Sequence, residues 1–440
     1  MISKYFNFEK EKTDLRTEII AGITTFLATM YIIIVNPSIL SATGMSYSGV
    51  LTATVLVSAF SSIMMGLYAK NPIVLAPGMG INAFFAYSVV IGMGVKWEVA
   101  LGAVFWSGII FLLLSIFNIR TLIVEAIPKQ IRYAVSAGLG LLITVVGFVN
   151  AKFIVDNPAT LISIGDFNVV TVTFLIGLMI TSILVIKRIK GALIFGIAIT
   201  TILTIPIGRF YGDASAVNAG IATLVTWKGL FAMPDTSVLF ALDLWGSLQL
   251  SLIPVMFAFL FTDMFDSLST FIGVAEAADI KDDKGEPRNV KESLIVDAFS
   301  TTISGLFGTS AGTSYIESAT GVEEGGRTGL TAIVAGLLFI PFMFFSPLLS
   351  VIPSIATAPA LILVGVFMMK PITKINWEKL DDAIPAFIGL TLIPLTYSIT
   401  QGIIWSFISW TIIKLALGKK EEVTVTLIII DLFAILSLIL

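Results

Sequence analysis

Long apolar runs alternate with short polar segments over the whole chain, and the runs have the length of membrane helices. A helix that crosses the hydrocarbon core of a bilayer needs about 20 mostly apolar residues, and twelve runs have or approach that length. They occupy residues 17–35, 49–69, 96–117, 129–149, 168–186, 191–207, 245–275, 291–308, 328–347, 356–370, 381–398 and 402–416. The pattern predicts an all-α polytopic membrane protein.

Two further segments are apolar but interrupted. The segment 72–91 begins within NPIVLAPGMG (residues 71–80) and continues as a half-helix, and residues 309–324 read TSAGTSYIESATGVEE. Counting both gives fourteen predicted transmembrane segments. The last apolar run, 423–440, is either a fifteenth crossing or a helix in the membrane interface, and the pattern leaves both open.

The lysine and arginine residues orient this arrangement. With the N-terminus in the cytoplasm, 22 of the 26 basic residues fall on the inner side, as the excess of basic residues in cytoplasmic loops requires. The longest outer segment is then about 208–244, and the most charged inner loop is 281–292. The first fifteen residues are too polar for a cleaved signal peptide. We therefore expect a multi-pass protein of the plasma membrane with a cytoplasmic N-terminus.

The chain also contains an internal repeat. VSAFSS followed by GLY, within residues 57–68, matches VDAFST followed by GLF, within residues 296–307, at a constant offset of 239. FLATMY at 26–31 likewise resembles FLFTDM at 259–264. Fourteen segments then form two halves of seven. Because seven is odd, the halves have opposite orientations, and the pattern predicts two inverted seven-span repeats.

The two interrupted segments are spans 3 and 10, third in each half. Backbone without helical hydrogen bonds is tolerated at membrane depth only where it lines a cavity or is buried in protein. We expect residues 72–76 and 309–313 to run extended, to cross near the midplane and to pair like a two-stranded sheet. Half-helices should begin near Gly78 and Tyr315, with their amide ends directed at the centre.

Two carboxylates near the middle of the run 245–275 mark a candidate site. Asp263 and Asp266 are three residues apart and therefore share one helix face. A charged Asp at the centre of a membrane helix costs about 2.5–3.5 kcal/mol, so both must face protein or water. The alternatives are an aqueous loop between two shorter helices, or acids that only brace neighbouring helices.

Further candidates lie beside the interrupted segments. Asn82 offers a donor and an acceptor, while ionised Glu317 offers only acceptors, so together they can recognise a hydrogen-bond pattern. Phe84 offers an aromatic face to a flat ligand. The alternatives are a salt bridge between Glu317 and a basic residue such as Arg327, an interhelical bond for Asn82 and a core or lipid-facing position for Phe84.

The amino-acid composition excludes several kinds of functional site. Hydrophobic residues make up 57% of the chain and charged residues 12%, far from the values of soluble proteins. The sequence has no Cys and no His, so a coupled proton must be carried by carboxylates, and no metal site is expected. The net charge of −3 carries no signature of nucleic-acid binding. We expect no cofactor, and no enzyme activity: the GxGD motif of an intramembrane aspartyl protease is absent.

The motifs together resemble a known family. TTFLATMYIIIVNP, NPIVLAPGMGINAFFAY, FTDMFDSLSTFIGVA, GTSAGTSYIESATGVEEGGRTGLTA and IPAFIGLTLIPLTYSITQGI are similar to the AzgA-like purine permeases, a branch of the nucleobase-cation symporter 2 (xanthine/uracil permease) family. The resemblance covers nearly the whole chain. It implies uptake of hypoxanthine, guanine or adenine by proton symport through alternating access. Related folds are often dimeric, which leaves a homodimer open.

The resemblance also implies a division of the chain into parts. A uracil-permease-like fold has core spans 1–4 in residues 1–127 and 8–11 in residues 245–350. Its gate spans 5–7 fall in residues 128–244, and spans 12–14 with the C-terminal segment fall in residues 351–440.

The resemblance implies that Asp263 and Glu317 bind the base, that Asn82 and Gly80 contribute and that Asp266 assists. With Thr313 and Phe84 added, we expect substrate binding by Asp263, Glu317, Asn82, Gly80, Thr313 and Phe84, and proton coupling by Asp263, Glu317 and Asp266. The uracil and xanthine permeases usually carry a His one turn after the first acid, where this chain has Ser267. This departure supports a purine-type site and leaves the proton path open.

An anion transporter of the same fold, for sulfate or bicarbonate, is the main alternative. It would require basic residues at the half-helix ends, where this chain has acids. A channel is less consistent with two interrupted spans, which favour alternating access. Which purine is preferred, and whether protons or sodium ions are coupled, stays open.

Overall fold

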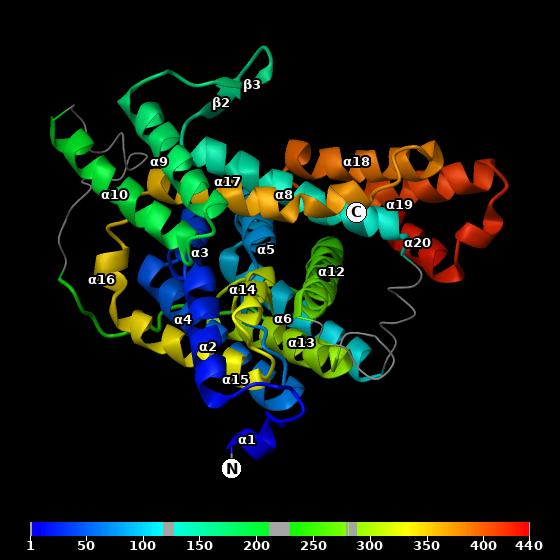
Figure 1. Ribbon diagram of the computed structural model, residues 1–440. Helices are drawn as coiled ribbons and strands as arrows, with labels where there is room; N and C mark the ends of the chain where they lie inside the picture. Colours follow the sequence, from blue (N-terminus) through cyan, green and yellow to red (C-terminus); the bar gives the residue numbers. More distant parts are fainter. Residues whose placement is uncertain (1, 118–126, 211–228, 279, 281–287, 440) are drawn as a thin grey trace.

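The computed structural model describes residues 2–117, 127–210, 229–278, 280 and 288–439, and these are mostly helical, as predicted (Figure 1). Among them, eight helices are long and apolar enough to cross a membrane. They are Leu15–Thr43, Tyr47–Ala69, Trp97–Ile116, Lys129–Asn150, Val169–Ile186, Leu250–Ala275, Ser354–Lys374 and Ile399–Ala416. The count of fourteen therefore stays a prediction. Much of the predicted inner loop 281–292 and outer segment 208–244 lies outside the described residues.

One group of helices, in the lower part of Figure 1, combines segments from both parts of the sequence. Helix α6 packs against α13, and α15 packs against α2 and α4. The members are α2 (Leu15–Thr29), α3 (Ile32–Leu40), α4 (Tyr47–Met64), α5 (Met79–Ala83) with η3 (Phe84–Gly92), α6 (Trp97–Ile116), α12 (Ile253–Ala278), α13 (Val290–Phe307), η5 (Ile316–Ser318) with α14 (Ala319–Glu323), and α15 (Gly329–Phe339).

A second group lies above the first in Figure 1. Helix α8 packs against α17 and α18, α9 against α10, and α18 against α19. The members are α8 (Lys129–Asn150), α9 (Val169–Ile186), α10 (Ala192–Phe210), α17 (Ser354–Met368), α18 (Leu380–Thr396) and α19 (Ile399–Ala416). A hairpin of β2 (Ile154–Asn157) and β3 (Leu161–Ile164) joins α8 to α9.

The C-terminal helix α20 (Val425–Ile439) packs against α19 and also contacts α12. Its 15 residues extend about 22 Å, less than the ~30 Å hydrocarbon core. This length favours the interfacial alternative for the last apolar run.

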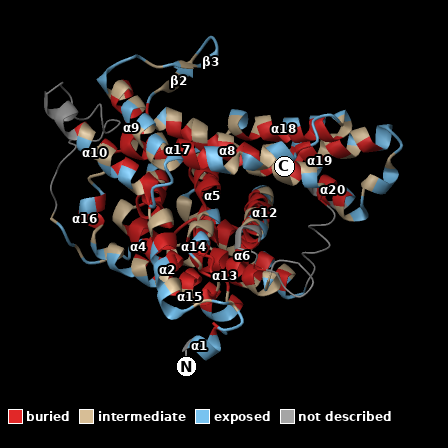
Figure 2. Ribbon diagram, in the orientation of Figure 1, coloured by how far each residue is buried: buried red, intermediate tan, exposed pale blue. Residues whose placement is uncertain are grey.

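Buried residues are concentrated in the interior of both groups, while exposed positions lie along the outer faces and at the chain turns (Figure 2). Many of the exposed side chains are large and apolar, such as Phe387 and Leu395 of α18. Apolar side chains on outer helix faces are expected where a protein meets lipid.

The interrupted segments meet as an antiparallel pair of strands at the centre of the first group. Strand β1 (Leu75–Pro77) pairs with β4 (Gly312–Ser314). The partners in register are Leu75 and Ser314, Ala76 and Thr313, and Pro77 and Gly312. The predicted extended breaks and their pairing are confirmed. The strands begin about three residues later than predicted, and the half-helices begin at Met79 and Ile316.

Side chains satisfy further backbone groups of these strands. The Ser62 hydroxyl of α4 lies 3.0 Å from the Leu75 amide and 3.1 Å from its carbonyl oxygen. The Ser318 hydroxyl accepts a bond of 3.0 Å from the Val74 amide. Because unpaired backbone groups are costly away from water, these serines allow the helices to be interrupted here.

Two glycines at equivalent positions of the sequence repeat permit close helix contacts in the first group. Gly66, in η2 (Met65–Ala69), lies directly against the backbone of Gly329 in α15. A Cβ atom added to Gly305 of α13 would stand 2.7 Å from the Leu101 carbonyl oxygen and the Phe105 amide nitrogen of α6. Neither position has room for a side chain without movement of backbone.

We predict that Gly66→Ala and Gly305→Ala each lower the free energy of unfolding by about 1–3 kcal/mol, because the methyl group must push two backbones apart. The thermal unfolding midpoint in detergent micelles measures this. Val366→Leu, which adds volume to a side chain that is 57% exposed, is the control and should leave the midpoint unchanged. Equal midpoints in all three variants would contradict the close packing.

Candidate functional site

Helix α12 carries both predicted acids and is continuous from Ile253 to Ala278. The aqueous-loop alternative is therefore wrong. Asp263 is fully buried, whereas Asp266 is partly exposed and Ser269, one turn further on, is exposed. The two acids thus differ in environment: Asp263 points into the protein, and Asp266 lies beside accessible space.

Thr301 of α13 holds Asp263. Its hydroxyl donates to Asp263 Oδ2 and also lies 3.0 Å from the Gly312 carbonyl oxygen of β4. A threonine hydroxyl has one proton, so it serves one acceptor at a time. The second oxygen, Asp263 Oδ1, is buried and has no partner in the described protein.

A third acid, Asp297, is fully buried and lies one turn before Thr301 on α13. Its Oδ1 accepts a bond of 3.1 Å from the Ser314 hydroxyl at the end of β4, and its Oδ2 has no partner among the described residues. Asp297 interacts electrostatically with Asp263. The sequence analysis missed this residue, although it stands in an apolar run rich in small hydroxyl residues, the same signal that identified Asp263.

Glu317 lies in the short helix η5, directly after β4. Its Oε1 accepts a bond of 2.7 Å from the hydroxyl of Tyr31, a second residue that sequence reasoning missed. The Arg327 guanidinium instead donates to the carbonyl oxygens of Val322 and Gly326, so the expected salt-bridge alternative for Glu317 is wrong. Glu317 and Asp266 are both partly exposed and close enough to interact electrostatically.

Asn82 of α5 is fully buried and uses only part of its hydrogen-bonding capacity. Its Oδ1 accepts a bond from the Ser310 hydroxyl, just before β4, while its Nδ2 has no partner in the described part of the chain. A buried amide with two unused protons is a ready donor to a ligand. The bond to Ser310 also fits the interhelical alternative, since it joins the two interrupted segments.

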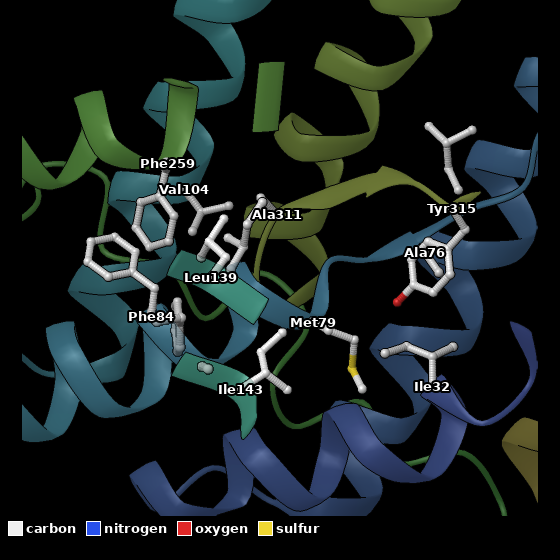
Figure 3. Close-up of a cluster of buried hydrophobic side chains, with 14 of the residues drawn as sticks. Ile32, Ala76, Met79, Phe84, Val104, Leu139, Ile143, Phe259, Ala311 and Tyr315 are labelled. Carbon is white, nitrogen blue, oxygen red and sulfur yellow. The ribbon is translucent and has the colours of Figure 1, made fainter. Parts of the chain in front are cut away.

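The remaining candidates are in close contact with their neighbours. Thr313 of β4 lies 2.8 Å, hydroxyl to hydroxyl, from Ser267 of α12. A Cβ added to Gly80 would stand 2.9 Å from a methyl carbon of Leu139 in α8. Figure 3 shows Leu139 and Ile143 of α8 reaching towards the cluster around Phe84 and Phe259. Helix α8 therefore covers this end of the site.

Phe84 is 1% exposed and packs edge-to-face on Phe259 of α12, with ring centroids 5.0 Å apart. Both residues belong to the main apolar core. In this arrangement Phe84 has the core position that the sequence left as an alternative, and a base would stack on it only after the ring moves.

The site holds four acids without counter-ions. Within the described residues, no lysine or arginine forms an ion pair with Asp263, Asp266, Asp297 or Glu317. A buried carboxylate without a cation is strongly disfavoured unless it is protonated or binds a positive ion. The arrangement offers acceptors and one free amide donor to a ligand and requires added positive charge.

Interrupted helices around buried acids, within many membrane-length helices, define a multi-pass membrane transporter. A family model described as the permease family, of the xanthine and uracil permeases, matches residues 16–404. The chain belongs to this family. It is a transport protein and not an enzyme.

Proteins of known name align with nearly the whole chain. The adenine permease AdeP of Escherichia coli (strain K12) is 42% identical, covering 100% of this chain and 96% of AdeP. The guanine/hypoxanthine permease PbuG of Bacillus subtilis (strain 168) is 40% identical and covers 95% of each chain. The resemblance to the purine-permease branch is thereby confirmed.

Solved structures share the fold. The transmembrane domain of the cyanobacterial bicarbonate transporter BicA aligns with a TM-score of 0.63 at 15% identity, covering 89% of this chain and 97% of that domain. The murine anion transporter Slc26a9, in its inward-facing state, aligns with a TM-score of 0.59 at 13% identity. The alignment covers 90% of this chain and 68% of the Slc26a9 chain. At these identities the likeness concerns the fold alone.

We predict that Thr301→Val destabilises the protein by about 1–3 kcal/mol, because it keeps the side-chain shape but leaves the buried Asp263 without its donor. Thr302→Val is the matched control: the neighbouring hydroxyl bonds only to the Ala298 carbonyl of its own helix, at 2.9 Å. Thermal unfolding in detergent compares the two variants. If both lower the midpoint equally, Thr301 does not hold Asp263.

Proposed function

We propose that this protein takes up a purine nucleobase, adenine, guanine or hypoxanthine, across the plasma membrane by proton symport. The observation that supports this most is the pairing of carboxylate acceptors with the free Nδ2 donor of Asn82 at the meeting point of the interrupted helices. Relatives over nearly the full chain are named adenine and guanine/hypoxanthine permeases, which supports the same substrate class.

The chemistry of a purine fits these groups. A purine presents N–H donors and ring-nitrogen or carbonyl acceptors on one planar edge. Glu317 and Asp263 would accept from the donors, and Asn82 would donate to an acceptor. Gly80, Thr313 and Phe84 would complete the binding site once Leu139 of α8, which lies against Gly80, has moved away.

Proton coupling follows from the uncompensated acids. We assign the coupled proton to Asp263, Glu317 or Asp266, because transit of several buried negative charges without a cation would be costly. Asp297 extends this set, since it interacts with Asp263. Protonation on the outer side and release on the inner side would give uptake against a purine gradient.

The geometry of the two strands supports the inverted repeat. Leu75 faces Ser314, its own counterpart at the sequence offset of 239, so the pairing is symmetric about that position. Gly66 and Gly305, also counterparts, are the close-approach points against α15 and α6. Beyond the eight long helices, we assign crossings to Met79–Gly92, α10, α13, the η5–α14 segment, α15 and α18, which gives fourteen.

We further propose alternating access between two domains. The first helix group would be the core, in residues 1–127 and 245–350, and the second the gate, in residues 128–244 and 351–440. Asp263 and Asn82 are fully buried, so a base can reach them only after movement of the gate helix α8. The N-terminus would be cytoplasmic, and two chains would form a homodimer.

An anion transporter of the same fold is the alternative, supported only by the likeness to BicA and Slc26a9. The four acids without counter-ions weigh against it, because they would repel sulfate or bicarbonate.

We predict saturable uptake of at least one of adenine, guanine and hypoxanthine, and no uptake of sulfate, because the site presents acids rather than bases. The measurement uses cells lacking their own nucleobase permeases, with radiolabelled adenine, guanine, hypoxanthine, xanthine, uracil and sulfate. Cells carrying the empty vector provide the control. Sulfate uptake without purine uptake would favour the anion transporter.

We predict that at least one of Glu317→Gln and Asp263→Asn abolishes accumulation against a gradient but still exchanges external for internal base. Each substitution keeps the shape of the side chain but removes the group that ionises. The base should therefore still bind, while the response to the proton gradient is lost. Asp266→Asn should have a smaller effect. Membrane vesicles with imposed proton or sodium gradients provide the measurement.

The control for these variants is Asp235→Asn. This acid lies outside the predicted spans and accepts bonds from Ser46 and Ser48. Normal accumulation with unchanged pH dependence in both Glu317→Gln and Asp263→Asn would exclude these acids as the coupling site and favour sodium coupling or passive transport.

A further inference from the structure

Tyr31, in the first predicted span, bonds to the acid of the second interrupted span. Its side chain is 1% exposed, and its hydroxyl donates to Glu317 Oε1 over 2.7 Å. A tyrosine hydroxyl has a single proton to donate, and this one is directed to the carboxylate. No described side chain donates to the other oxygen, Glu317 Oε2.

The backbone and ring of Tyr31 are both held in place. The residue stands between α2 and α3, where its carbonyl oxygen accepts bonds from the amides of Ile34 (3.1 Å) and Val35 (3.0 Å). Its ring lies 6.4 Å from the ring of Tyr315, whose hydroxyl donates to the Pro77 carbonyl oxygen over 2.5 Å. The donor to Glu317 is therefore preorganised.

Glu317 has few other fixed contacts. It is partly exposed, and the titratable groups that face it are Tyr31, Tyr315 and Asp266. Asp266 carries like charge, whereas the Tyr31 hydroxyl donates to Glu317, a bond that a carboxylate accepts more strongly than a neutral acid does. Because the carboxylate is planar, a bond that fixes Oε1 also fixes the direction in which Oε2 points.

We infer that Tyr31 is a positioning residue for purine binding: it fixes Oε1 of Glu317, keeps the carboxylate an acceptor, and leaves Oε2 to receive an N–H of the base. This inference rests on the proposed function. It places a determinant of substrate binding in the first span, at a residue that does not itself need to touch the base.

The test is equilibrium binding of radiolabelled adenine, guanine and hypoxanthine to the purified full chain in detergent, across a range of pH. Tyr31→Phe should weaken binding of the recognised base about tenfold, the size of effect of a lost bond to a charged group. Loss of the donor favours the protonated acid. When the solution is acidified, Tyr31→Phe should therefore lose its bound base at a higher pH than the wild type does.

Two comparisons separate this role from a structural one. Tyr47→Phe removes another tyrosine hydroxyl, which bonds to the Leu349 carbonyl oxygen at 3.2 Å, and should bind as the wild type does at every pH. In a Glu317→Gln background, Tyr31→Phe should cause a smaller loss, because a bond to a neutral amide oxygen contributes less than a bond to a carboxylate.

The outcomes are distinct. If the wild type binds a purine and Tyr31→Phe binds it equally with the same pH profile, the inference is overturned while the proposed function stands. An equal loss in the Glu317→Gln background overturns it as well, and a wild type that binds no purine overturns both. Should Tyr31→Phe not fold, Tyr31→His, which keeps an N–H donor, must bind more tightly than Tyr31→Leu; equal affinity contradicts the inference.

Discussion

Backbone groups that lack helical partners are the constraint on which the rest of this structure depends. In hydrocarbon each unpaired amide or carbonyl costs several kcal/mol, and the interruptions at β1 and β4 leave such groups in the middle of the protein. The chain pairs the two interruptions with each other and adds the hydroxyls of Ser62 and Ser318. That pairing fixes where the half-helices begin, and with them the positions of Asn82 and Glu317.

The interrupted segments and the acids of α12 were predictable from the sequence because each violates a strong rule. Glycine clustered with proline or with small polar residues disfavours an unbroken membrane helix, and carboxylates do not face lipid. The residues at which the strands begin were not predictable with the same precision. Their start depends on which amides find partners in β4 and in the neighbouring helices, and those partners come from distant parts of the chain.

Other features depend wholly on tertiary contacts. Tyr31 is 286 residues from Glu317, and nothing in its local sequence distinguishes a hydroxyl that binds an acid from one that faces a lipid headgroup. Asp297 was detectable by the same reasoning as Asp263, because it is also an acid within an apolar run. It lies in VDAFST, which the sequence analysis used only to align the two repeats. For Phe84 the pattern allowed both stacking and core packing, and only the contact with Phe259 distinguishes them in this structure.

The strand pair also sets an order of events during synthesis. Leu75 leaves the ribosome 239 residues before Ser314, which at about 5–20 residues per second is a delay of roughly 10–50 s. Throughout that interval β1 is already made and its partner is not. Water, the insertion machinery or temporary contacts must shelter its backbone until β4 arrives. The centre of the protein is thus among the last parts to assemble, and a nascent chain that stalls before residue 312 would be a substrate for membrane quality control.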